Sequence, residues 1–152
     1  VSVLRTVDSS LALILTRMQV LAKSLPEYST VREMGGVGDV LAVKLIAEIG
    51  DVRRLHSAKA LIAWAGIDPP PYESGQFIGS KRKITKRGSS TLRKIGYEVM
   101  RVLKSHPAPE DDAVYNYILK KESEGKSKKH AKIAGLNKFL RIYYARVIEV
   151  YQ

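Results

Sequence analysis

The sequence contains no cysteine, which excludes disulfide bonds and metal sites built on thiolates. It has no apolar run long enough to span a membrane, and no cationic amphipathic helix with aromatic anchors indicates binding to a membrane surface. No signal peptide is recognisable, which is typical of an intracellular protein. The hydrophobic content of 45% is enough to build a core without disulfide bonds.

Acidic residues are few: 15 Asp and Glu stand against 26 Lys and Arg, so the net charge is +11. Such an excess favours a polyanionic partner, and nucleic acid is the leading candidate. The length of 152 residues suits one domain, or one domain with an extension. Because the chain begins at Val1 in the middle of a pattern, we expect a fragment of a longer protein.

Residues 1–25 carry apolar side chains at alternating spacings of three and four, which predicts a helix with a heptad seam. Pro26 ends the pattern. Two interpretations stay open: a helix that packs on its own domain, or a coiled-coil arm through which the chain dimerises. The seam consists of Leu4, Val7, Leu11, Ile14, Met18, Leu21 and Leu25.

Residues 30–50 predict a short helix, a glycine-rich turn and a second helix, an arrangement that resembles a helix-hairpin-helix. Asp39 is expected as the N-cap of the second helix and Gly50 as its end. The backbone around Gly36 and Gly38 could hold DNA phosphates, and a purely structural tight turn is the alternative.

Further helices are predicted over 57–65, 89–105, 110–124 and 128–151, so the fold is expected to be mainly α, with six or seven helices. The prolines and glycines of residues 67–88 exclude a helix and predict a long ordered loop, or a short hairpin around 72–84. Trp64 is interpreted as a core anchor rather than a platform for base stacking. The inner face of the 89–105 helix is expected to carry Leu92, Ile95, Val99 and Val102.

Cations precede and open the predicted helix at 89–105. Free backbone N–H groups and the positive end of the helix dipole favour an anion there. Arginine adds forked donors that suit phosphate. We therefore predict nucleic-acid contacts at Lys81, Arg82, Lys83, Lys86, Arg87, Arg93 and Lys94.

Ser89 and Ser90 lie at the start of this helix, where serine is a favoured N-cap and needs no chemistry. A serine that faces a phosphate neutralised by arginine could instead act as a nucleophile. No histidine or carboxylate adjacent in sequence is available to accept the hydroxyl proton. The histidines, which we interpret as ordinary surface residues, are His56, His106 and His130.

The acidic residues do not predict a metal site. Asp111 and Asp112 are adjacent and would point to different sides of a helix. The remaining candidates are scattered, and each is explained as a cap or turn residue: Asp39, Glu48, Asp51 and Asp68. We therefore expect no metal ion and no cofactor within this chain.

Several motifs follow one another in a set order over residues 30–150. Each is weak by itself, but their order and spacing are specific. The chain resembles the C-terminal transposase domain of the DEDD-type insertion-sequence transposases, the group that includes the Piv DNA invertases and the bridge-RNA-guided recombinases. The motifs are 34–38, 47–51, 63–69, 72–75, 84–89, 92–94, 125–129 and 140–143.

The resemblance implies a longer protein, in which an RNase-H-like domain carries an acidic site for magnesium and a coiled coil precedes this domain. Residues 1–25 would then be the end of the coiled coil and residues 26–152 the DNA-binding domain. The family's catalytic serine would fall on Ser89, or on Ser90 if the register differs by one. This fragment by itself would lack magnesium-dependent cleavage.

The implied partners are DNA, a guide RNA and a second copy of the chain bound through residues 1–25. The implied location is the cytoplasm, in association with the nucleoid. The competing interpretation is a DNA-binding and dimerisation domain without catalysis, in which Ser89 only caps its helix.

Overall fold

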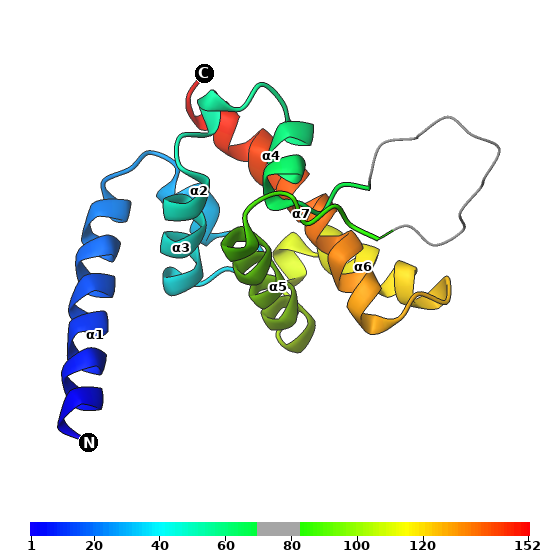
Figure 1. Cartoon of the computed structure of the whole chain (residues 1–152). Helices are drawn as coiled ribbons and strands as arrows, with labels where there is room; N and C mark the ends of the chain where they lie inside the picture. Colours follow the sequence, from blue (N-terminus) through cyan, green and yellow to red (C-terminus); the bar gives the residue numbers. More distant parts are fainter. Residues whose placement is uncertain (70–82) are drawn as a thin grey trace.

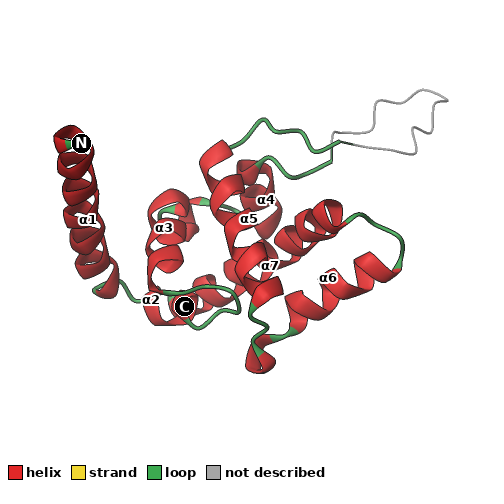
Figure 2. Ribbon diagram, turned by 90° about the horizontal axis from the view of Figure 1, so that it is seen from below, coloured by secondary structure: helices red, strands yellow, loops and turns green. Residues whose placement is uncertain are grey.

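The computed structural model describes residues 1–69 and 83–152, and within these ranges the chain forms helices and no strand. The prediction of a mainly α fold is therefore confirmed (Figures 1 and 2). Two short 3-10 turns, η1 (Val52–Arg54) and η2 (Pro109–Asp111), interrupt the helical series. The α-helices are α1 (Ser2–Lys23), α2 (Tyr28–Arg32), α3 (Asp39–Ile49), α4 (Ala58–Ala65), α5 (Ser90–Ser105), α6 (Ala113–Ser123) and α7 (Lys128–Val150).

Helix α7 lies at the centre of the fold and packs against α4, α5 and α6 (Figure 1). Helix α3 joins this group through α5 and α2. The inner stripe of α7 recurs every three or four residues, as a helix buried on one side requires. It consists of Ala131, Gly135, Leu136, Phe139, Leu140, Tyr143 and Val147, all buried.

Serines and glycines set several helix boundaries as the sequence predicts. The Ser57 Oγ accepts a hydrogen bond from the Ala60 N–H at 3.2 Å and so caps α4. Gly50 ends α3 and Gly66 ends α4, both with positive φ, which a glycine adopts without steric cost.

Two predicted helix starts are wrong in detail. Gly38, not Asp39, is the N-cap of α3, and the Asp39 carboxylate instead accepts hydrogen bonds from Arg32 and Tyr28. The helix predicted from residue 110 begins at Ala113, because Pro109 starts the separate turn η2.

Two predicted core residues are also wrong. Val102 and Trp64 are both exposed, and the positions that α5 buries in its last two turns are Val99, Met100 and Leu103. Helix α5 turns these three residues toward its neighbours, which leaves Val102 on the outer side.

The glycine-rich turn between α2 and α3 packs against α5. A side chain at Gly36, whose φ is +80°, would lie 2.7 Å from the Val99 carbonyl oxygen. Gly36 is therefore explained by this close approach, as the structural interpretation of the turn predicts. Gly38 is exposed, and a side chain there would meet no atom within 4 Å.

Helix α1 extends away from the other helices and touches α2 and α3 only through its C-terminal part (Figures 1 and 2). Ala22 is its one buried residue, and Met18 is half-buried against the core. Leu4 and Leu11 keep 68% and 58% of their surface exposed. The interpretation that the whole helix packs on its own domain is therefore wrong for its N-terminal half.

The end of the chain is held to the start of α2. The Tyr151 hydroxyl donates to the buried Glu27 carboxylate at 2.5 Å, and the Arg53 guanidinium lies 4.3 Å from the centre of the Tyr151 ring. The hydrogen bond to Glu27, followed by burial, raises the pKa of Tyr151 to about 12.

Candidate nucleic-acid interface

Ser89 is the N-cap of α5 and lies half-buried. Its Oγ accepts a hydrogen bond from the Leu92 N–H at 2.9 Å, which confirms the predicted cap. The same hydroxyl donates to Oε1 of Glu48 at 2.5 Å. The hydroxyl thus has a carboxylate partner that sequence reasoning missed.

Glu48 stands in the last turn of α3, 41 positions before Ser89. The packing of α3 on α5 brings the two residues together. The prediction that Glu48 serves as a cap or turn residue is therefore wrong. The sequence held one signal, since Glu48 lies inside the 47–51 motif, but no local spacing links it to the serine.

The end of α4 holds the loop before Ser89 in place. The Ser89 N–H donates to the Trp64 carbonyl oxygen at 2.6 Å, and the Lys86 N–H donates to the Gly66 carbonyl oxygen at 2.9 Å. Lys86 adopts a left-handed conformation with φ 57°, which a residue with a side chain adopts only when its surroundings hold it there. Gly88 lies so close to Trp64 that a side chain at Gly88 would collide with the Trp64 carbonyl.

Lys83, Lys86, Arg87 and Lys94 are exposed around this helix start. None of them forms an ion pair with another residue of the described ranges. No carboxylate of the described ranges therefore neutralises these charges near the free N–H groups of α5, a combination that favours a phosphate.

Arg93, also predicted to contact nucleic acid, forms hydrogen bonds within the chain through one nitrogen of its guanidinium. Its Nη1 donates to the carbonyl oxygens of Ala65 and Gly88, each at 3.2 Å. Arg93 therefore holds α4 to the loop before α5, and its guanidinium is partly occupied. Ser90 is the exposed first residue of α5, while Lys81 and Arg82 lie outside the described residues.

Acidic side chains within the described part of the chain do not gather into a metal site: no group of three or more His, Asp or Glu residues is placed to hold an ion. Asp111 binds the Arg146 guanidinium at 2.8 and 3.0 Å and accepts the Gly35 N–H at 2.9 Å. The hydrogen bonds from Arg146, helped by the Gly35 N–H and the Arg146 charge, lower the pKa of Asp111 below its usual range.

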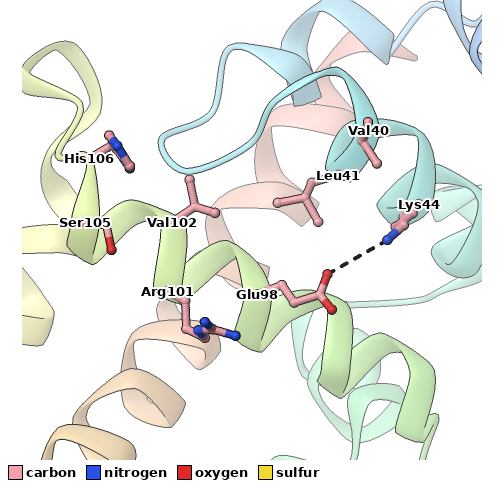
Figure 3. Close-up of a pocket in the computed structure, with 8 residues that line it drawn as sticks. All are labelled: Val40, Leu41, Lys44, Glu98, Arg101, Val102, Ser105 and His106. Atoms are coloured by element: carbon pink, nitrogen blue, oxygen red, sulfur yellow. Dashed lines mark ion pairs between the residues drawn. The ribbon is translucent and has the colours of Figure 1, made fainter.

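An open groove of about 430 Å³ lies between α3 and α5 (Figure 3). Its rim holds an ion pair at 3.9 Å between Lys44 and Glu98. Glu98 is nine residues beyond Ser89, or about 13 Å along the helix. The groove is thus separate from the cationic helix start and contains none of its predicted residues. It is lined by Val40, Leu41, Lys44, Glu98, Arg101, Val102, Ser105 and His106.

Among the described residues, no helix combines the length and the apolar character needed to cross a membrane.

The chain belongs to a family of transposases: residues 28–116 match the model of the Transposase IS116/IS110/IS902 family. It is 31% identical over 110 residues to the pilin gene-inverting protein of Moraxella bovis, a match that covers 72% of this chain and 33% of the relative. It is 29% identical over 92 residues to the transposase for insertion sequence element IS1111A of Coxiella burnetii. This match covers 59% of this chain and 24% of the relative.

A protein of insertion element IS116 from Streptomyces clavuligerus is 32% identical over 95 residues, covering 62% of this chain and 23% of the relative. The matched part of the chain thus spans about a quarter to a third of the length of these relatives. The family resemblance predicted from the ordered motifs is confirmed.

Proposed function

We propose that this chain is the part of a DNA transposase or site-specific recombinase that binds the DNA backbone at the start of α5 and presents Ser89 as the nucleophile. The observation that carries the proposal is the hydrogen bond between the Ser89 hydroxyl and the Glu48 carboxylate, at a helix start surrounded by exposed cations. The printed names of the relatives, a gene-inverting protein and a transposase, agree with this class of reaction.

The chemistry follows from that arrangement. As the Ser89 Oγ attacks phosphorus, its proton passes to Glu48, an O–P bond to serine forms and the P–O bond to one deoxyribose breaks. The oxygen that leaves takes a proton from water. The lysines and Arg87 offset the charge that develops on the phosphoryl oxygens.

Three further expectations belong to the same proposal. Magnesium would bind the acidic site of an RNase-H-like domain, which the resemblance implies outside the residues of this chain. A guide RNA would share the cationic surface with DNA at the nucleoid. A second copy of the chain would bind along α1.

A second candidate function is a binding domain without catalysis. The hydrogen bond from the Leu92 N–H to the Ser89 Oγ favours it, because a capping serine is complete without any reaction. In that case the Glu48 carboxylate only fixes the orientation of the Ser89 hydroxyl.

Replacing Ser89 separates the two candidates in a full-length protein that contains this domain. Ser89→Ala should abolish strand transfer and leave DNA affinity within about twofold, and the lost cap should cost about 1 kcal/mol of stability. Ser57→Ala is the matched control, since Ser57 caps α4 in the same way. Strand transfer by Ser89→Ala at the normal rate would refute the nucleophile and leave the binding domain.

Glu48→Gln tests the proton acceptor. The amide retains an oxygen that can accept the Ser89 hydrogen bond but binds a proton far less readily. We expect strand transfer to slow about 10²- to 10⁴-fold, with the loss partly recovered at higher pH, while DNA affinity stays the same. A normal rate would show that Glu48 does not take the proton.

Arg87→Ala tests the phosphate site. Loss of one cation should weaken binding to every DNA sequence and reduce the slope of log K against log salt by about one unit. Arg5→Ala, a change at an exposed arginine of α1, is the control for net charge alone. Equal slopes for the two variants would place the phosphate elsewhere.

A further inference from the structure

Trp64 is the only tryptophan of the sequence, and its side chain keeps 40% of its surface exposed. The other aromatic side chains within the described residues are buried or half-buried. Full burial of a large aromatic side chain stabilises a fold by about 2–3 kcal/mol, and this fold uses only part of that gain at Trp64. Exposure alone proves no role, whereas the position of the ring beside the Ser89 segment indicates one.

The main chain of Trp64 contacts the segment that contains Ser89. The Trp64 carbonyl accepts the Ser89 N–H at 2.6 Å, and the backbone of Gly88 lies directly against it. The indole therefore leaves the main chain next to the proposed phosphate site. A nucleotide bound by its phosphate at the start of α5 would bring its sugar and base into this neighbourhood.

A fixed cation lies over one face of the Trp64 ring, so a stacked base would take the opposite face. The guanidinium carbon of Arg54 is 5.2 Å from the centre of the Trp64 ring. Arg54 is held by hydrogen bonds to the Ile49 carbonyl oxygen, at 2.7 Å from Nη2 and 3.3 Å from Nε. Arg54 itself is exposed, so its charge faces the solvent next to the indole.

An exposed aromatic ring beside ordered arginine suits one kind of ligand, a nucleotide whose base is unpaired. The π-face of the base stacks on the indole, and the phosphate interacts with the cations. A base inside a duplex has both faces covered by its neighbours and cannot stack in this way. An apolar protein partner would gain from the indole but not from the exposed positive charge.

We infer that Trp64 is a stacking platform for an unpaired base of the strand whose phosphate binds at the start of α5. This inference rests on the proposed function only in taking nucleic acid as the ligand, and it does not require Ser89 to react. The strand can be DNA or RNA, because the π-face is common to both.

Fluorescence tests the inference directly, since the chain has a single tryptophan. The wild-type chain is titrated with a single-stranded DNA 12-mer, a duplex of the same sequence, an abasic 12-mer and a single-stranded RNA of the same sequence. Quenching by a base-bearing single strand, with none by the abasic strand and less by the duplex, supports stacking. Equal quenching by the abasic strand, or none by either base-bearing strand, overturns it.

Matched variants measure the contribution of the ring. Trp64→Leu should weaken binding of the base-bearing strand about 5- to 150-fold, whereas Trp64→Phe should retain most of the affinity. Neither should change affinity for the abasic strand. Affinity is read from the anisotropy of labelled strands, and circular dichroism checks the fold. Equal affinity of Trp64→Leu and wild type for every strand would overturn the inference.

The inference and the proposed nucleophile fail separately. Ser89→Ala should quench as the wild type does, because the indole and its Arg54 neighbour are unchanged. If single strands quench the Trp64 fluorescence and Ser89→Ala still transfers strands, the stacking platform is retained and the nucleophile is excluded. If no strand quenches and Ser89→Ala has lost strand transfer, the nucleophile is retained and the stacking platform is excluded.

Discussion

At the scale of single residues, Asp111 shows how one carboxylate joins distant parts of the chain. It lies in η2, binds Arg146 of α7 through both oxygens and accepts the N–H of Gly35 from the turn before α3. Arg146 lowers the pKa of Asp111, which makes this contact dependent on pH. A group with a lowered folded-state pKa stabilises the fold above its ordinary pKa and loses that effect as the pH falls through the folded value.

We predict that Asp111→Asn lowers the free energy of unfolding by about 1–2 kcal/mol at pH 7. The difference from wild type should shrink between about pH 4 and pH 2, as the wild-type carboxyl takes up its proton. Urea unfolding at several pH values measures it. Asp112→Asn, a change at the exposed neighbouring carboxylate, should show neither effect. A constant difference across that range would contradict the prediction.

Gly88 is a second residue with a specific physical requirement. Because a methyl group there would collide with the Trp64 carbonyl, Gly88→Ala must push the loop away from α4. We expect a loss of at least about 2 kcal/mol in thermal or chemical unfolding. Gly38→Ala is the control: a side chain there meets open space, and the weaker N-cap costs about 1 kcal/mol or less. Equal losses for the two would show that the loop is free to move.

Local chemistry explains which residues could be interpreted from sequence. Ser57 and Ser89 each cap a helix by accepting a hydrogen bond from the N–H three residues ahead, so a short window contains both partners. The contact between Ser89 and Glu48 joins two helices across 41 positions, and only their packing creates it. Residue type alone predicts Trp64 in the core, whereas its exposure depends on which side of α4 the neighbouring helices cover.

At the scale of elements, the contact between α5 and α7 depends on a glycine. Gly96 is buried in α5, and a side chain there would collide with Leu136 of α7. We predict that Gly96→Ala destabilises the protein by about 1–3 kcal/mol, although alanine has the higher helix propensity. Leu136→Ala alone should cost about 2–5 kcal/mol, because it leaves a cavity.

The double variant distinguishes this contact from general damage. Gly96→Ala with Leu136→Ala should lose less stability than the two single losses added together, by at least about 0.5 kcal/mol, since the new methyl group enters the space that the leucine leaves. Gly96→Ala with Val102→Ala, a change at an exposed position of the same helix, should be additive. Additive losses in both pairs would mean that the two helices do not meet at Gly96 and Leu136.

Helix boundaries show the same division between local and distant causes. Gly50 and Gly66 end α3 and α4 because the positive φ that each end requires is a local property. The local sequence does not predict the start of α6 at Ala113, because contacts with distant residues fix the preceding turn. Asp111 in that turn is bound to residues 35 and 146, which no window around position 110 contains.

At the scale of the whole molecule, the N-terminal half of α1 presents an apolar seam that no described part of the chain covers. The heptad spacing predicts this seam, and the sequence alone could not decide between packing on its own domain and pairing with a second chain. In the structure the seam residues of the N-terminal half do not pack on their own domain, because all four are exposed: Leu4, Val7, Leu11 and Ile14. We therefore expect α1 to associate with α1 of a second copy.

We predict that the chain forms dimers whose mass, measured by light scattering at micromolar concentration, falls by half in Leu4→Glu with Leu11→Glu. Two charges in the seam would face two more from the other copy, which strongly disfavours pairing. The fold of each chain should not change, because both leucines are exposed in the single chain, and circular dichroism melts should confirm it. Arg5→Glu with Thr16→Glu alters exposed residues of α1 outside the seam and should leave the mass unchanged. A monomeric wild type, or a mass that the seam charges do not alter, would exclude pairing through α1 and leave its apolar surface for a different partner.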